Sequence, residues 1–229
     1  QTFEKGILKF TVLEQSREES QADSAVKVSS IDRLTALSDS VYDKVLTIPG
    51  YVEHNGCKYQ VRKVDDEAFS HCDYIEDIII EEGVEEIGQS AFANCYGIKS
   101  LLLPSTVKYI DVSSFKKCTN LKEITVAKEN RFFDSRDNSN ALIETAENEL
   151  FLGCKTTVIP NSVTNIMANA FVGSSVESIT FSDGLESIGR KAFAGSRLKS
   201  LIIPKSVKRI YEEAFRYCTS LESIIFPDS

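Results

Sequence analysis

Two histidines, each close to a cysteine, are the residues whose types could hold a metal ion. His54 lies shortly before Cys57, and His71 directly precedes Cys72. A structural zinc site needs such ligands in pairs that converge on one point. Cys72, however, occupies a core position that recurs along the chain, so its neighbour His71 should project elsewhere. We therefore expect no metal and no cofactor.

The acidic residues Glu81, Glu82, Glu85 and Glu86 are the nearest approach to a set of paired carboxylates. They fall in one connecting turn and lack the alternating spacing of a calcium-binding loop, so a solvated acidic face is expected. The sequence contains no Ser/His/Asp or Cys/His arrangement and no glycine-rich phosphate loop. A nucleophilic cysteine would need an exposed, activated thiolate, and four of the six cysteines should be buried. We therefore expect no enzymatic activity.

The composition narrows the classes of partner. The 229 residues carry a net charge of −8, with −9 in residues 1–100 and +1 in residues 101–229. Nucleic acids and anionic membranes both attract clusters of Lys and Arg, so neither is expected as a partner. The chain is 42% hydrophobic, but no apolar run approaches the roughly 18 residues of a membrane-spanning helix. A charged, solubilising surface is the simplest interpretation.

The chain begins at Gln1 without a methionine and shows no signal peptide. This fits a secreted or surface protein whose signal peptide has been removed, although a chain trimmed for any other reason would begin the same way.

The elements that must position any site come from an internal repeat. The sequence of residues 84–106, VEEIGQSAFANCYGIKSLLLPST, recurs with variations along the chain. Three copies begin 23 residues apart and three more begin 22 residues apart, at Val61, Val84, Val107, Val163, Leu185 and Val207. Self-similarity at this period predicts a solenoid, in which each unit buries its apolar face against its neighbours.

Each copy predicts one strand and one short turn of helix. Side chains alternate along a strand, so Leu101 and Leu103 should point into the core and Leu102 outward. Stacked copies should form a parallel sheet, and segments such as Gly88–Cys95 fit one or two turns of α or 3₁₀ helix. The repeated phenylalanines should stack as a ladder: Phe69, Phe92, Phe115, Phe171, Phe193 and Phe215.

Four cysteines follow the repeat: Cys72, Cys95, Cys118 and Cys218 each come three residues after the repeated phenylalanine. Cysteine is commonly buried as a small apolar residue. Adjacent rungs would bring three of these thiols to about 5 Å, but side chains in a ladder run parallel and do not face each other. We expect all four to be free thiols, which thiol titration in denaturant would detect.

Residues 1–60 do not fit the repeat and are interpreted as a β-rich cap, with an independent ligand-binding domain as the alternative. Strands are expected at Gly6–Leu13, Ala25–Ile31 and Val45–Ile48, and a polar loop at Glu14–Ser24. The segment Val52–Val64 should form a hairpin, because Asn55-Gly56 is a favoured two-residue turn.

One irregular rung, residues 131–162, interrupts the six regular copies of the solenoid at 61–229. Its end, 158–163, matches 202–207, so the sheet strand should be retained there. Ala141–Thr145 and Glu149–Cys154 should pair as a hairpin in which Asn148 takes a left-handed conformation. Phe132 and Phe133 should pack beneath it.

The repeat resembles the BspA-like, or treponemal-type, leucine-rich repeat. The pattern Val-x-x-Ile-x-x-x-Ala-Phe-x-x-Cys-x-x-Leu-x-x-Ile-x-Ile-Pro covers Val61 to Pro227, and five of six copies keep Ala-Phe. Ser114 departs from it, as do Ser174 and Ser196, which replace Cys. The resemblance implies an α/β solenoid: a right-handed leucine-rich-repeat superhelix with a parallel sheet on one face and short helices opposite. It also implies a secreted or surface-attached bacterial protein used in adhesion or host contact, without catalysis.

The outward side chains at the centre of the sheet are the candidate binding residues. By strand alternation they are Ile79, Leu102, Thr125, Thr180, Ile202 and Ile225. Contiguous exposed aliphatic residues mark interaction sites, and the partner would be a protein or glycoprotein such as a host matrix protein. The alternatives are that the aliphatic residues reflect only the preferences of parallel sheets, and that the array is a structural spacer.

The last rung has no polar repeat after it to cover Phe215, Leu221 and Ile224. An exposed edge strand invites pairing, so weak self-association through this rung is expected.

Overall fold

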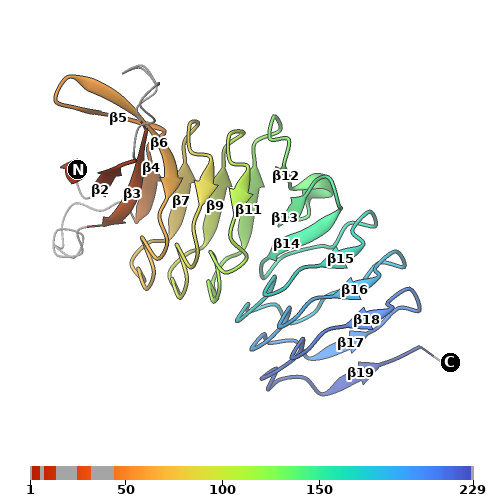
Figure 1. Cartoon of the computed structure of the whole chain (residues 1–229). Coiled ribbons are helices and arrows are strands. Elements are labelled where there is room, and N and C mark those ends of the chain that lie inside the picture. The colour runs from red at the N-terminus through yellow and green to blue at the C-terminus, as the bar shows by residue number, and fades with distance from the viewer. Residues whose placement is uncertain (1, 6–7, 14–24, 32–43, 228–229) are drawn as a thin grey trace.

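The computed structural model describes residues 2–5, 8–13, 25–31 and 44–227. Stacked rungs run from β7 to β11, and the array then bends and continues from β15 to β19 (Figure 1). The expected loop at 14–24 lies outside the described residues. In the described part of the chain, no helix is both long and apolar enough to cross a membrane.

The expected parallel sheet is present, but in two parts. Four strands pair in the order β11-β9-β7-β4: β4 (Val45–Ile48), β7 (Asp77–Ile80), β9 (Ser100–Leu103) and β11 (Glu123–Val126). Two more pair beyond the bend, β17 (Ser200–Ile202) and β19 (Ser223–Ile225). Residues 158–160 and 177–182 form no strand, so the prediction that the strand is retained at 158–160 was wrong.

A second side of the array is built from two-residue strands that the sequence did not indicate. They are β8 (Glu86–Ile87), β10 (Tyr109–Ile110), β15 (Asn165–Ile166), β16 (Ser187–Ile188) and β18 (Arg209–Ile210). They stack in parallel at the repeat spacing; Glu86, for example, pairs with Tyr109 and Ser187 with Arg209.

The third side consists of turns, so the expected short helices are not confirmed. The one helix among the described residues is a 3₁₀ turn, η2 (Arg136–Asn138). In the second copy Ser90 and Asn94 have positive φ angles of 52° and 57°. This alternation directs backbone groups to the adjacent rung: Phe92 N donates to Ser114 O at 2.8 Å. A continuous helix would keep those donors within its own turn, so rung-to-rung hydrogen bonding replaces helix here.

The phenylalanine ladder exists as two stacks of three. Ring centroids are 5.3 Å apart for Phe69–Phe92 and 5.1 Å for Phe92–Phe115. Beyond the bend the distances are 4.7 Å for Phe171–Phe193 and 5.6 Å for Phe193–Phe215. The buried residues correspondingly form two apolar clusters, which divide at the irregular rung.

The cysteine ladder is confirmed, and none of the six cysteines, all of which lie in the described part of the chain, forms a disulfide bond. Three of the ladder thiols can donate to the carbonyl of the phenylalanine one rung earlier: Cys95 Sγ lies 3.0 Å from Phe69 O, Cys118 Sγ lies 3.2 Å from Phe92 O, and Cys218 Sγ lies 3.1 Å from Phe193 O. Burial raises the pKa of the Cys95 thiol to about 12. Burial likewise raises the pKa of the Cys118 thiol, so these two thiols stay protonated at neutral pH and serve as core residues.

The N-terminal strands are β1 (Thr2–Lys5), β2 (Leu8–Val12), β3 (Ala25–Ile31), β5 (Tyr51–His54) and β6 (Cys57–Val64). The predicted β5–β6 hairpin is confirmed, with φ angles of 52° at Asn55 and 76° at Gly56. β3 pairs with β6, which continues into the short strands, while β4 already lies beside β7. The array sheet thus begins before residue 61, and a separate cap at 1–60 stays a prediction.

The irregular rung contains β12 (Phe133–Asp134), β13 (Ala141–Glu144) and β14 (Glu149–Gly153). The predicted β13–β14 hairpin is confirmed, with Asn148 at a φ of 57°. Only Phe133 packs beneath it, because the Phe132 side chain is 46% exposed.

Buried Asn130 fixes the entry to this rung. Its amide nitrogen donates to Pro104 O and Val107 O, and its oxygen accepts from the backbone N–H groups of Phe132 and Phe133. These four hydrogen bonds use the full capacity of the side chain.

Candidate binding face and the groove beside it

The outward side chains of the sheet form two aliphatic patches. Ile79, Leu102 and Thr125 face outward in successive paired strands, as do Ile202 and Ile225 beyond the bend. The exposed fractions are 42% for Leu102, 68% for Ile202 and 56% for Ile225, whereas Ile79 is half-buried. The inward neighbours are covered: Leu101 is 1% and Ile203 3% exposed. The strand alternation expected from the sequence therefore holds in these strands.

Thr180 does not join the two patches. It is exposed, but it lies in the segment that forms no strand. The irregular rung removes the ladder at this point, so the six candidate residues do not form one continuous column.

Charged side chains line the edge of the first patch. Glu76 Oε1 accepts from Lys44 Nζ at 2.6 Å and its Oε2 accepts from Lys99 Nζ at 2.5 Å. These two hydrogen bonds lower the pKa of Glu76 to about 2. Between the same two rungs, Ser100 Oγ donates to Asp77 Oδ1 at 2.5 Å. The patch is thus aliphatic at its centre and polar at its rim, as protein interfaces commonly are.

A groove of about 690 Å³, here called the sheet groove, adjoins the first patch. One wall is formed by residues 123–128, which include the strand β11. The other wall is formed by side chains from the segment 134–140. The 141–154 hairpin does not line this groove, because β13 is buried in the core and the segment before it forms the wall.

Asp134 and Arg136 hold the second wall in shape. Arg136 donates from Nε to Asp134 Oδ1 at 2.7 Å and from an Nη atom to Asn148 Oδ1 at 2.6 Å. Burial raises the pKa of Asp134, but the hydrogen bonds from Arg136 and Thr145 outweigh it, and the pKa is lowered. The carboxylate is therefore charged at neutral pH and paired with Arg136. The Asp-x-Arg spacing was the one signal in the sequence that could have indicated this wall.

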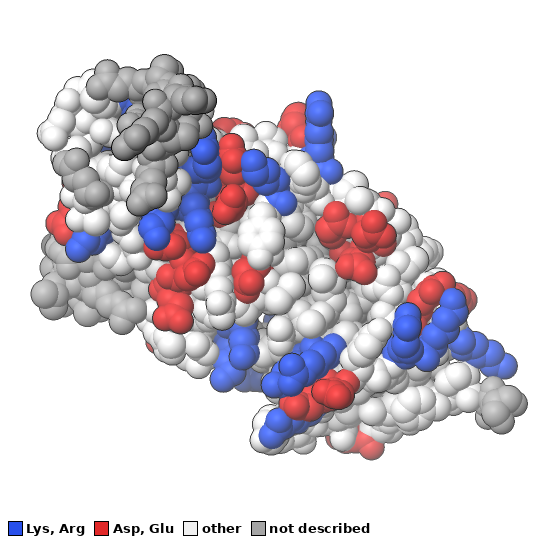
Figure 2. Space-filling view, in the orientation of Figure 1, with Lys and Arg blue, Asp and Glu red and all other residues white. Residues whose placement is uncertain are grey.

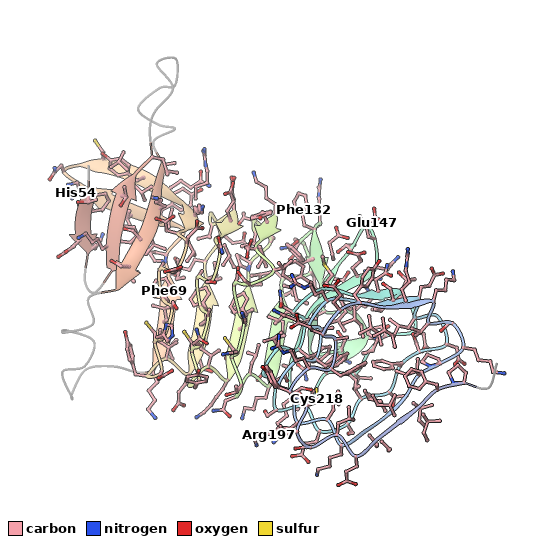
Figure 3. The ribbon with its side chains drawn as sticks, turned by 60° about the horizontal axis from the view of Figure 1, so that its bottom comes forward. His54, Phe69, Phe132, Glu147, Arg197 and Cys218 are labelled. Carbon is pink, nitrogen blue, oxygen red and sulfur yellow. The ribbon has the colours of Figure 1, made fainter. Side chains whose placement is uncertain are left out.

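The residues considered for metal binding lie apart. His54 stacks on Phe3 with ring centroids 4.1 Å apart, at the N-terminal end of the molecule (Figure 3). His71 is exposed and contacts Ser70, while Cys72 is buried. Glu82 accepts hydrogen bonds from Ser105. Among the described residues, no group of three or more His, Cys, Asp or Glu side chains could hold a metal ion.

The stacked rungs, the parallel sheet and the phenylalanine ladder define a leucine-rich repeat protein. The family model for the BspA type leucine-rich repeat region with six copies matches residues 52–147 and 144–229. The chain belongs to this family.

Crystal structures of other proteins resemble this chain over nearly its whole length. The pneumococcal vaccine antigen PcpA is 16% identical, with all of this chain and 82% of that chain covered and a TM-score of 0.50. A leucine-rich repeat protein from Eubacterium ventriosum is 17% identical, with 97% and 70% covered and a TM-score of 0.54. At these identities the likeness shows the fold alone. A search of curated proteins found no match.

Proposed function

We propose that the chain is a non-catalytic binding module that holds a protein or glycoprotein partner against its sheet face. The observation that carries this proposal is the exposure of Leu102, Ile202 and Ile225 at the centre of the paired strands. Aliphatic side chains contribute roughly 1.5–3 kcal/mol each when fully buried, before the cost of association. The sheet groove adds a concave, polar-walled surface directly beside the first patch.

The proposed location is the bacterial surface or the extracellular medium. The family and the similarity to a pneumococcal vaccine antigen support it. A host matrix protein is the partner that such a location favours. Because the bend separates the patches, an elongated partner would be needed to use both (Figure 1).

The test is a binding screen of the chain against host matrix proteins and glycoproteins, followed by the double variant Leu102→Asp with Ile202→Asp. Both side chains point away from the core, so the fold should survive while binding of the selected partner falls at least about a hundredfold. Circular dichroism and the Tm check the fold.

The control variants are Leu101→Asp and Ile203→Asp, which place a carboxylate in the core and should unfold the array. Retained binding in the Leu102/Ile202 double variant would move the site elsewhere. If no partner is selected by the screen, the alternative of a structural spacer is favoured.

A further inference from the structure

A second groove of about 520 Å³, here called the turn groove, lies at the bend on the turn side of the array. Turns from the third copy, residues 116–119, form one bank of it, and turns from the last three copies form the other. The two banks are tied by a hydrogen bond from Lys117 N to Val172 O at 3.1 Å. Arg197 and Cys218 mark this region in Figure 3, on the side away from Phe132 and Glu147. The turn groove is thus distinct from the sheet groove.

The hollow results from the residues at one position of the repeat, which stack in a column from rung to rung. The second residue after each repeated phenylalanine has a positive φ, and in two successive copies it is glycine, Gly173 and Gly195. The flanking copies carry Lys117 and Tyr217 in the same column, with φ angles of 63° and 59°. At this position, two successive rungs have only a glycine, and the rungs on either side of them carry the long side chains of Lys117 and Tyr217. The column spans three rung spacings, about 14 Å.

Positive charge gathers around this hollow, although the chain as a whole carries −8. The lining includes five cationic side chains and one carboxylate: Lys116, Lys117, Lys191, Arg197, Arg216 and Glu213. Glu213 is already engaged by Arg216 at 2.7 Å and by Lys191 at 3.5 Å. None of the ion pairs among the described residues involves Lys116, Lys117 or Arg197, all of which are exposed. Figure 2 shows Lys and Arg side chains on both sides of the concavity at the bend.

The glycine floor offers no free backbone N–H group to an extended peptide. Gly173 N donates to Ala194 O and Gly195 N donates to Arg216 O, both at 2.8 Å. Recognition by addition of a strand needs unpaired backbone donors and acceptors, so it is not available here. Side chains must recognise the ligand, through cations and the rings of Tyr96 and Tyr217, which are 43% and 70% exposed. A tyrosine ring combines an apolar face with a hydroxyl, which suits a ligand built of rings that carry hydroxyl groups.

We propose that the turn groove binds an acidic oligosaccharide, whose sulfate or carboxylate groups contact Lys117 and Arg197 and whose sugar rings lie over the glycine floor. The volume is within the usual range for small-ligand sites. This site is separate from the sheet face and does not depend on the function proposed for it.

The test is isothermal titration of the chain with a heparin hexasaccharide and a hyaluronan hexasaccharide, which separate sulfate from carboxylate recognition. Neutral maltohexaose and a hexaglutamate peptide are the comparison ligands. At least one acidic oligosaccharide should bind, and its affinity should fall as salt is raised. Lys117→Glu with Arg197→Glu should weaken binding at least about tenfold.

The matched control is Lys9→Glu with Lys205→Glu, which makes the same charge change at exposed residues outside the groove. It should leave the affinity nearly unchanged. Gly195→Asn, which fills the floor without a change of charge, should weaken binding; Asn94 shows that asparagine accepts this backbone position. Leu102→Asp with Ile202→Asp should bind the oligosaccharide like the unaltered chain.

Three outcomes would overturn the proposal. Neither acidic oligosaccharide binds, the two charge-reversal pairs weaken binding equally, or hexaglutamate binds as tightly as the oligosaccharide. The second outcome would indicate general attraction of polyanions, and the third an acidic protein as the ligand.

Discussion

Gly153 occupies the place in the core where the two stacks of phenylalanine rings fail to meet. A Cβ atom at this position would lie 2.0 Å from Cε1 of Phe171. The ring that begins the second stack therefore packs on the backbone of the β13–β14 hairpin and not on Phe115. The repeat predicted the rings themselves, but this contact depends on how the irregular rung folds, which no residue pattern in the repeat encodes.

Replacing Gly153 with Ala should destabilise the chain by about 1–3 kcal/mol, because the added methyl group forces the Phe171 ring out of its packed position. Urea denaturation measures the change. Gly184→Ala is the control; its nearest atom would be 3.2 Å away, so the loss should be smaller. Phe171→Leu should recover part of the loss in the Gly153 variant, and a strictly additive double variant would contradict the contact.

At the residue scale the outward face of the sheet was largely predictable, since strand alternation alone places Leu102 and Ile202 outward. Thr180 was misplaced because the strand that should carry it does not form. Phe132 was misplaced because it lies just before β12, and only Phe133, the first residue of that strand, takes the inward position.

Among the elements, the longer strands and the hairpins were predictable, because alternation and the Asn55-Gly56 turn are local signals. The turn side was not. Its backbone alternates between negative and positive φ angles. Lys117 and Glu213, for example, have positive φ angles, although lysine and glutamate rarely adopt them in proteins. Hydrogen bonds to the adjacent rung impose this conformation, so a single copy of the repeat carries little signal of it.

The ion pairs of Glu76 with Lys44 and Lys99 should make the stability of the fold depend on pH. The pKa of Glu76 is about 2 in the folded chain, held below the ordinary value of 4.5 by hydrogen bonds from Lys44 and Lys99. Because the folded pKa is depressed, the stabilisation is fully present above about pH 4.5. It is lost progressively as the pH falls from 4.5 through 2.

The titration of the Glu76 carboxyl carbon by NMR checks this directly, with an expected midpoint of about 2. Lys99→Ala removes one donor, so the midpoint should rise toward 4.5. Lys199→Ala, which removes the partner of Glu177 on a distant rung, should leave Glu76 unchanged. A midpoint that stays the same in the Lys99 variant would mean that this hydrogen bond does not form in solution.

At the scale of the whole molecule, the bend produces features that no single copy contains. The cationic side chains of the turn groove come from copies of the repeat that lie more than 50 residues apart in the sequence. Lys117 and Arg197 are examples of such side chains. Net charge alone argued against nucleic acids and anionic membranes as partners, since the chain carries −8. The local charge depends on which turns lie close together at the bend. The irregular rung, and not the composition of the chain, determines which turns these are.

The division of the core should be visible in hydrogen exchange. Phe193 is fully buried between Phe171 and Phe215 in the second cluster, so Phe193→Ala should cost about 3–5 kcal/mol. In a solenoid each rung contacts only its neighbours, so local opening should concentrate in residues 159–226. Amides of β7 and β9 should keep most of their protection, and Phe92→Ala should give the reverse pattern. If Phe193→Ala accelerates exchange equally in β7, β9 and β17, the two stacks unfold as one unit and the irregular rung transmits stability across the bend.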